Sequence, residues 1–141
     1  MPALRHIEAD LATTGQLTPE DLRQLVAQGF QTFIFNRPDQ EEADQPETQA
    51  LQETAEALGA TWIHQPVVSG QVTDEQGAEF GRLYAAAPKP VLAFCRTGAR
   101  CGTLWALSQQ QQRPGHELVA QLKEAGFDLP DLFQRLTHNQ A

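Results

Sequence analysis

Short apolar runs alternate along the chain with longer segments of helical periodicity. The runs at residues 31–36, 61–66 and 91–94 predict buried strands, and residues 11–16 are compatible with a short strand before them. Between and after these runs the pattern predicts helices at residues 18–28, 48–58, 73–86, 103–110, 117–125 and 131–136.

Several helix ends carry signals that do not depend on hydrophobicity. Thr18 is a suitable N-cap, Pro19 suits the first helical position, and Gly29 suits the end of the same helix. Thr73, with Gln76 three residues later, forms a capping-box pattern. These signals support two of the predicted helices independently.

Alternation of strands and helices predicts an α/β fold. We expect one domain over residues 1–141, with three layers: a mostly parallel sheet of four or five strands and helices on both faces. In such sheets ligands bind at the carboxyl ends of the strands.

The composition limits the partners of the protein. The net charge of −8 at pH 7 argues against a nucleic-acid partner, because binding to phosphate backbones needs a cationic face. The apolar runs are too short to span a membrane, and the first residues lack the apolar core of a secretory signal. We expect a cytoplasmic protein that binds neither nucleic acid nor membrane.

The chain has two cysteines, Cys95 and Cys101. A structural disulfide is not expected in a reducing compartment. The spacing of the cysteines and the scattered histidines do not match a zinc site, which needs close pairs of ligands. We therefore expect no metal and no cofactor.

The segment with the clearest chemistry is Cys-Arg-Thr-Gly-Ala-Arg at residues 95–100, between a predicted strand and a predicted helix. Free N–H groups at a helix start and neighbouring arginines favour the thiolate form of a cysteine, which is the nucleophilic form. The expected catalytic groups are Cys95 and Arg100, and the expected anion-binding groups are Arg96, Thr97, Gly98, Ala99 and Cys101.

Two other loops follow predicted strands and are expected at the same edge of the sheet. Arg37 and Asp39 lie in one, and residues 67–72 form the other. Arg37 either joins the anion site or pairs with Asp39. Asp39 is the candidate catalytic acid; Asp74 is a second candidate, although its place in a first helical turn is better explained by the helix dipole.

These residues resemble a known bacterial family. Segments at 17–22, 36–39, 66–67 with 73–75, and 90–100 are similar in kind and order to the phosphatase-like domain of β-lactamase-hydrolase-like proteins, and they include Asn-Arg-Pro-Asp and Cys-Arg-Thr-Gly-Ala-Arg. The resemblance covers about residues 5–112 and implies the fold of dual-specificity tyrosine phosphatases. Some members are fused to a persulfide dioxygenase and linked to sulfide detoxification, which implies a separate dioxygenase chain as a partner here.

One chemistry for this loop is hydrolysis of a phosphate ester, with Cys95 as the phosphoryl acceptor. Cysteine phosphatases use a His-Cys-x5-Arg loop and a general acid. This chain has Phe94 before the cysteine, one residue fewer before Arg100, and no acid at residues 67–72. Phosphatase activity is therefore the alternative interpretation.

Sulfur transfer is the preferred interpretation. Rhodanese-type enzymes use a six-residue loop that often reads Cys-Arg-x-Gly-x-Arg, as here, and need no general acid. The thiolate of Cys95 would take a sulfane sulfur and become a persulfide. In both chemistries the partner is a small anion, either a sulfane-sulfur donor or a phosphate ester. A third interpretation is a non-catalytic sensor of anions or redox state.

Cys101 has two interpretations. The family usually has serine or threonine at this position, where the hydroxyl could hydrogen-bond the thiolate. A cysteine there could accept sulfur from Cys95 or resolve an oxidised Cys95 as a disulfide. The other interpretation, a small residue packed in the first turn of a helix, is slightly preferred.

Overall fold

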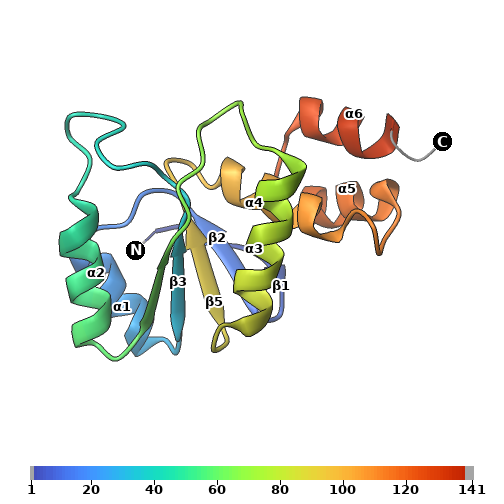
Figure 1. The fold of residues 1–141 in the computed structure, drawn as a ribbon. Helices are drawn as coiled ribbons and strands as arrows, with labels where there is room; N and C mark the ends of the chain where they lie inside the picture. The colour runs from blue at the N-terminus through green and yellow to red at the C-terminus, as the bar shows by residue number, and fades with distance from the viewer. Residues whose placement is uncertain (1, 139–141) are drawn as a thin grey trace.

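The computed structural model describes residues 2–138, and its centre is a five-stranded sheet (Figure 1). The strands are β1 (Arg5–Glu8), β2 (Leu11–Thr14), β3 (Thr32–Phe35), β4 (Thr61–His64) and β5 (Val91–Phe94). Their order is β1-β2-β5-β3-β4, with β1 antiparallel to β2 and the other three pairings parallel. The predicted α/β fold with a mostly parallel sheet is confirmed.

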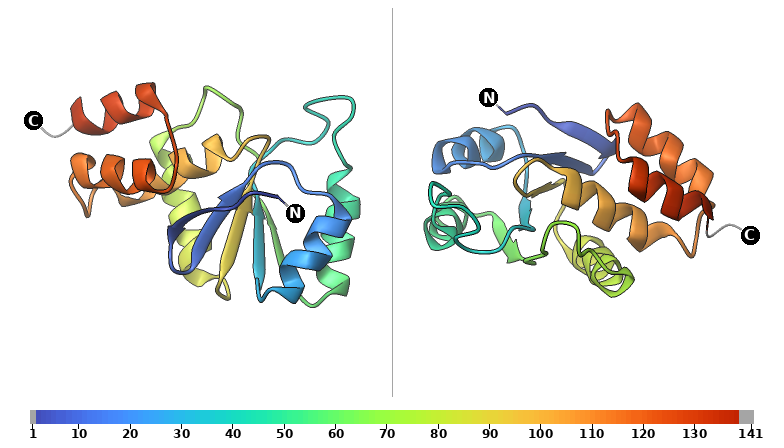
Figure 2. Two further views of the ribbon diagram at one scale, coloured as in Figure 1. Left: turned by 180° about the vertical axis from the view of Figure 1, so that it is seen from behind. Right: turned by 90° about the horizontal axis from the view of Figure 1, so that it is seen from above.

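Helices cover both faces of the sheet. They are α1 (Pro19–Ala27), α2 (Thr48–Ala57), α3 (Asp74–Ala86), α4 (Ala99–Gln109), α5 (Gly115–Glu124) and α6 (Pro130–His138). In the views of Figure 2, α1 and α2 lie on one face, α3 and α4 on the other, and α5 and α6 form a pair beyond α4. None of the described helices has the length and apolar character needed to cross a bilayer.

The two hydrophobic clusters follow the alternation of side chains along the central strands. Phe33 and Phe35 of β3 pack with α1 and α2, whereas Ile34 between them packs with α3 and α4. All four residues of β3 and all four of β5 are buried, as the apolar runs predict for strands covered on both faces.

Strand β1 is absent from the prediction. Its sequence is Arg-His-Ile-Glu, and only Ile7 is buried. An edge strand with three polar residues out of four has no apolar run, so its place depends on pairing with β2 rather than on a local pattern.

The predicted helix starts at Thr18 and Thr73 are confirmed as capping boxes. Helix α4 begins at Ala99 rather than at residue 103. Gly98 and Gly102 flank its first turn, and because glycine has a low helix propensity, the sequence pattern does not show the helix start.

The parallel strands end in register. Phe94, the last residue of β5, pairs with the last residues of β2 and β3, Thr14 and Phe35. Phe35 pairs in turn with His64, the last residue of β4. The loops that follow these strands therefore leave the sheet at one edge, as expected. We call this edge the carboxyl edge.

Candidate active site

Cys95 follows β5 at the carboxyl edge and is fully buried. The backbone N–H of Gly98 donates a hydrogen bond to its Sγ over 3.1 Å. Gly98 is the N-cap of α4 and offers no side chain to the helix start. The helix start is therefore not capped by its N-cap residue, and the N–H of Gly98 is directed to the sulfur.

Two glycines allow this loop to lie close to β2. Gly98 has a φ of +95°, which L residues with a side chain rarely adopt, and a Cβ there would lie 3.3 Å from the Thr14 carbonyl oxygen. A Cβ on Gly15 would lie 2.9 Å from the Arg96 carbonyl oxygen. Gly98 thus allows both the turn and the close approach.

Cys101 lies in the first turn of α4 and is fully buried. Its thiol donates a hydrogen bond to Oδ1 of Asn36 over 3.2 Å. The amide of Asn36 is oriented by Gln65, since its Nδ2 donates to both the backbone and the side-chain oxygen of that residue. Cys101 is therefore a packed residue with a specific polar contact.

The two cysteines have opposite pKa shifts. The thiol of Cys101, followed by backbone N–H groups including that of Gly98, lowers the pKa of Cys95 to about 5 in spite of its burial. Burial raises the pKa of Cys101 well above its ordinary value, and the adjacent Cys95 adds to this. Asn36 accepts the thiol proton of Cys101 in this structure, so the Cys95 thiolate competes with Asn36 for that proton. At neutral pH Cys95 is the thiolate and Cys101 the thiol.

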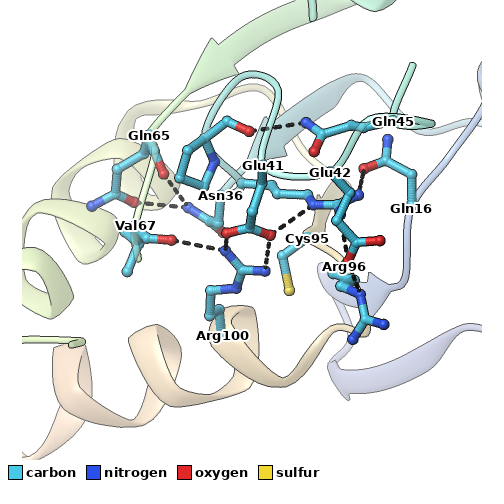
Figure 3. Close-up of polar contacts among 12 residues, drawn as sticks. Gln16, Asn36, Glu41, Glu42, Gln45, Gln65, Val67, Cys95, Arg96 and Arg100 are labelled. Atoms are coloured by element: carbon cyan, nitrogen blue, oxygen red, sulfur yellow. Dashed lines mark hydrogen bonds and ion pairs between the residues drawn. The ribbon is translucent and has the colours of Figure 1, made fainter. Parts of the chain in front are cut away.

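Arg100 also lies in the first turn of α4, and its side chain is only 8% exposed. Its Nη1 and Nη2 each donate to one carboxylate oxygen of Glu41 over 2.8 Å. Nη1 donates in addition to the backbone oxygen of Val67 over 2.9 Å. The guanidinium is therefore held in one orientation beside the Cys95 loop (Figure 3).

Arg37 joins the same cluster from the loop after β3. Its Nε donates to Glu41 over 2.8 Å, its Nη2 pairs with Glu42 at 3.2 Å, and its Nη1 donates to Gln16 over 3.0 Å. The alternative pairing of Arg37 with Asp39 is wrong. The i,i+4 spacing from Arg37 to Glu41 brings the two together, and Asp39 is exposed on the turn between them.

The carboxylates that pair with these arginines, Glu41 and Glu42, belong to the segment between β3 and α2. We call this segment, residues 38–47, the strap. It has neither helix nor strand and crosses the carboxyl edge beside the Cys95 loop. The contact with Arg100, followed by that with Arg37, lowers the pKa of Glu41 to about 2. The sequence analysis missed Glu41, although its spacing from Arg37 was a usable signal.

The exposed part of the Cys95 loop has a different set of contacts. Arg96 is 57% exposed at its side chain and pairs with Glu42 at 2.5 Å. Thr97 is exposed, and its hydroxyl accepts a hydrogen bond from the N–H of Ala99. Of the expected anion-binding residues, Gly98 thus contacts the sulfur through its backbone N–H. The Arg96 side chain instead points to the strap.

The loop after β4 lies on the other side of Arg100. A groove of about 380 Å³ runs from Arg100 along residues 69–72 to the start of α6. Residues 67–72 contain no acid. Asp74 pairs with Arg135 of α6 at 2.5 Å, in agreement with its place in the first turn of α3. No hydrogen bond or ion pair among residues 2–138 links Asp39 or Asp74 to the Cys95 loop.

Comparisons with known proteins give one family. The family model described as "Beta-lactamase hydrolase-like protein, phosphatase-like domain" matches residues 3–112. A beta-lactamase hydrolase-like protein from Agrobacterium fabrum is 36% identical over 133 residues, which cover 92% of this chain and 30% of that protein. The chain thus spans less than a third of the length of this relative.

Solved structures share the fold. A candidate phosphatase from Neisseria meningitidis superimposes with a TM-score of 0.84 at 34% identity, covering 94% of this chain and 95% of that chain. The structure called Tk-PTP in the active form has a TM-score of 0.75 at 20% identity and covers 97% of each chain, a likeness of fold alone.

Proposed function

Because this chain belongs to the phosphatase-like domain family of the beta-lactamase hydrolase-like proteins, we propose that it is a cysteine-dependent phosphatase that hydrolyses phosphate monoesters. This reverses the order of the two chemistries preferred from the sequence. The structural relative at 34% identity is described as a candidate phosphatase, and none of the reported comparisons names a sulfurtransferase.

One observation carries the proposal: a buried thiolate, a backbone N–H at a helix start and an arginine fork lie close together. Gly98 donates its N–H to the sulfur of Cys95, and Arg100 is held nearby with its fork in a fixed orientation. A phosphoryl group needs this combination, because backbone N–H groups and a guanidinium stabilise the equatorial oxygens while a nucleophile attacks from below.

We derive the reaction in two steps. The Cys95 thiolate attacks phosphorus, a P–S bond forms, and the P–O bond to the leaving group breaks with its electron pair on oxygen. Water then attacks the phosphocysteine, so that a P–O bond forms and the P–S bond breaks with its electron pair on sulfur; the thiolate returns, and inorganic phosphate leaves with both protons of the water. Cys101 stabilises the departing thiolate through its thiol proton, as it stabilises the resting one.

The leaving group sets the expected substrates. Residues 67–72 supply no acid, so an alkoxide would leave with little help, whereas an aryl oxide is a more stable anion. We therefore propose small aryl phosphates as the best substrates in vitro, with Asp39 as the residue to test for a residual role as acid.

Sulfur transfer is the second candidate, favoured by the six-residue loop and by the same lack of an acid. A sulfane sulfur would bind covalently to the Cys95 thiolate, and the donor would leave as a stable anion. The persulfide dioxygenase partner implied by the family resemblance would belong to this candidate.

One experiment distinguishes the two. Purified protein and its Cys95→Ser variant are incubated with an aryl phosphate and, separately, with thiosulfate or glutathione persulfide, and released phosphate and intact mass are recorded. We expect phosphate release that depends on Cys95. A catalytic product from the sulfur donor, with an added sulfur on the wild-type protein and no phosphate release, would replace the proposal by sulfur transfer.

A further inference from the structure

The strap carries a ligand of its own for the anion site. The carboxylate of Glu41 accepts three hydrogen bonds from two arginines: two from Arg100 and one from Arg37, each at 2.8 Å. Figure 3 shows Glu41 reaching onto Arg100, with Cys95 beside the pair. A planar fork of this kind binds carboxylates and phosphates by the same bidentate geometry.

The nucleophile beside this contact is closed to solvent. Cys95 has no exposed surface, although a nucleophile that attacks a substrate must be reached by it. Residues 41–44 of the strap are exposed on their outer side and belong to no helix or strand, so moving them breaks no ladder of backbone hydrogen bonds. The interactions that hold the Glu41 carboxylate are ionic, and the Glu41 side chain is 24% exposed although both arginines are nearly buried.

We propose that Glu41 is an internal competitor, a carboxylate that every external anion must displace from Arg100, and that it thereby raises the affinity an anion needs to occupy the site. This inference rests on the proposed function and adds the charge class of its substrate. The internal ligand weakens the binding of all anions by the same factor. The anions that still occupy the site are those that gain most from the guanidinium and the loop N–H groups.

A doubly charged anion gains about twice the Coulomb energy of a singly charged one at the same distance. Displacement of Glu41 therefore leaves dianionic phosphate monoesters as ligands. Monoanions, such as phosphodiesters and carboxylates, match the charge of Glu41 itself and lose against a competitor that is tethered to the protein at high effective concentration.

The test uses two tetrahedral oxyanions that differ in charge, sulfate and perchlorate. Each is titrated for its protection of Cys95 against iodoacetamide, with the labelled site located by peptide mapping. The proteins are the wild type, Glu41→Ala, Glu41→Gln and Asp44→Asn. The last is a matched control, since it removes one negative charge from the same strap and Asp44 makes no hydrogen bond or ion pair with the described residues.

We expect Glu41→Ala to tighten both anions by the same factor, roughly ten-fold, the value of about one charge-assisted hydrogen bond. Without any anion, the rate of Cys95 labelling should also rise. Glu41→Gln should shift both quantities in the same direction and serves if the alanine variant folds poorly. Asp44→Asn should leave both within about two-fold of wild type.

Three results would overturn the proposal. Weaker anion binding in both Glu41 variants would make Glu41 a positioning residue for Arg100. Unchanged binding would mean that the carboxylate does not compete. A gain for sulfate larger than that for perchlorate would mean that Glu41 stays beside the bound anion and repels it. The assay needs no turnover, so its outcome does not depend on whether the protein is a phosphatase.

Discussion

The Cys95 loop and the strap contribute to one site in different ways. The loop brings together a sulfur and N–H groups that are neighbours in the sequence, and the start of α4 holds them in place. The strap contributes side chains whose partners are far away along the chain, such as Glu41 with Arg100, 59 residues apart. Local geometry therefore sets the surroundings of the Cys95 sulfur, and long-range ion pairs hold the arginine beside it.

The largest effect should come from the nucleophile itself. Cys95→Ser removes the thiolate, and an alcohol with an ordinary pKa replaces it only poorly, so we expect kcat with an aryl phosphate to fall by at least about a thousand-fold. Cys101→Ser is the matched control, because a hydroxyl can donate the same hydrogen bond; its kcat should stay within about ten-fold of wild type. Equal losses in both variants would contradict the assigned roles.

The next effect concerns the residue that joins the two regions. Arg100→Lys keeps the charge but loses the fork that binds two oxygens at once, and we expect kcat/KM to fall by about a hundred-fold. Arg96→Lys, at an exposed arginine of the same loop, should change kcat/KM by less than about three-fold. Steady-state kinetics with one aryl phosphate compares kcat/KM of the two variants. A larger loss of kcat/KM for the Arg96 variant would mean that the anion binds at the exposed Arg96 rather than at Arg100.

A third change separates loop geometry from general stability. Gly98→Ala forces a side chain into a left-handed backbone and towards the Thr14 carbonyl, which should cost about 1–3 kcal/mol of unfolding free energy and reduce activity. Gly59→Ala has a similar φ of +84° with nothing within 4 Å of the new Cβ. It should cost about 1–2 kcal/mol and leave kcat unchanged. Urea unfolding and kinetics on both variants test this, and full activity of Gly98→Ala would count against the loop as the anion site.

The pH dependence tests the support of Cys95 by Cys101. With a pKa of about 5, Cys95 is protonated below that pH, so the rate of iodoacetamide labelling should rise through pH 5 and level off towards neutral pH. Cys101→Ala removes the main cause of the lowered pKa, so its titration should move to higher pH, and Cys101→Ser should lie between. The same depression means that the thiolate stabilises the fold above the ordinary pKa, and that this contribution is lost as the pH falls to about 5. A titration unaffected by Cys101→Ala would leave the N–H groups as the main cause.

The smallest effect is expected at Asp39. The strap exposes this carboxylate, and it contacts neither the loop nor Arg37 in the described part of the chain. Asp39→Asn should change kcat for an aryl phosphate by less than about two-fold. The comparison with an alkyl phosphate is the sensitive one, since a selective loss with the poorer leaving group would identify Asp39 as the catalytic acid.

Much of the fold was accessible from the pattern of residues. Strands β3 and β5 are buried on both faces, so they read as continuous apolar runs, and the capping boxes at Thr18 and Thr73 are local by nature. Strand β1 was not accessible, because Arg5–Glu8 buries one side chain only and owes its conformation to β2. The first turn of α4 was not predicted, because Gly98 and Gly102 flank it and glycine has a low helix propensity; the loop requires Gly98 for its positive φ.

The sequence by itself determined that Cys95 lies at a strand end and a helix start, and that the loops after three strands meet at one edge. Both follow from short-range geometry and from the common direction of parallel strands. Only the tertiary structure decided which charges meet there. Arg37 has Asp39, Glu41 and Glu42 within five residues, and the choice among them depends on where the strap crosses Arg100 and Arg96. The strength of an ion pair depends on the distance between the two charges in space. Where several acidic residues lie close together in the sequence, the sequence does not show which of them is at that distance.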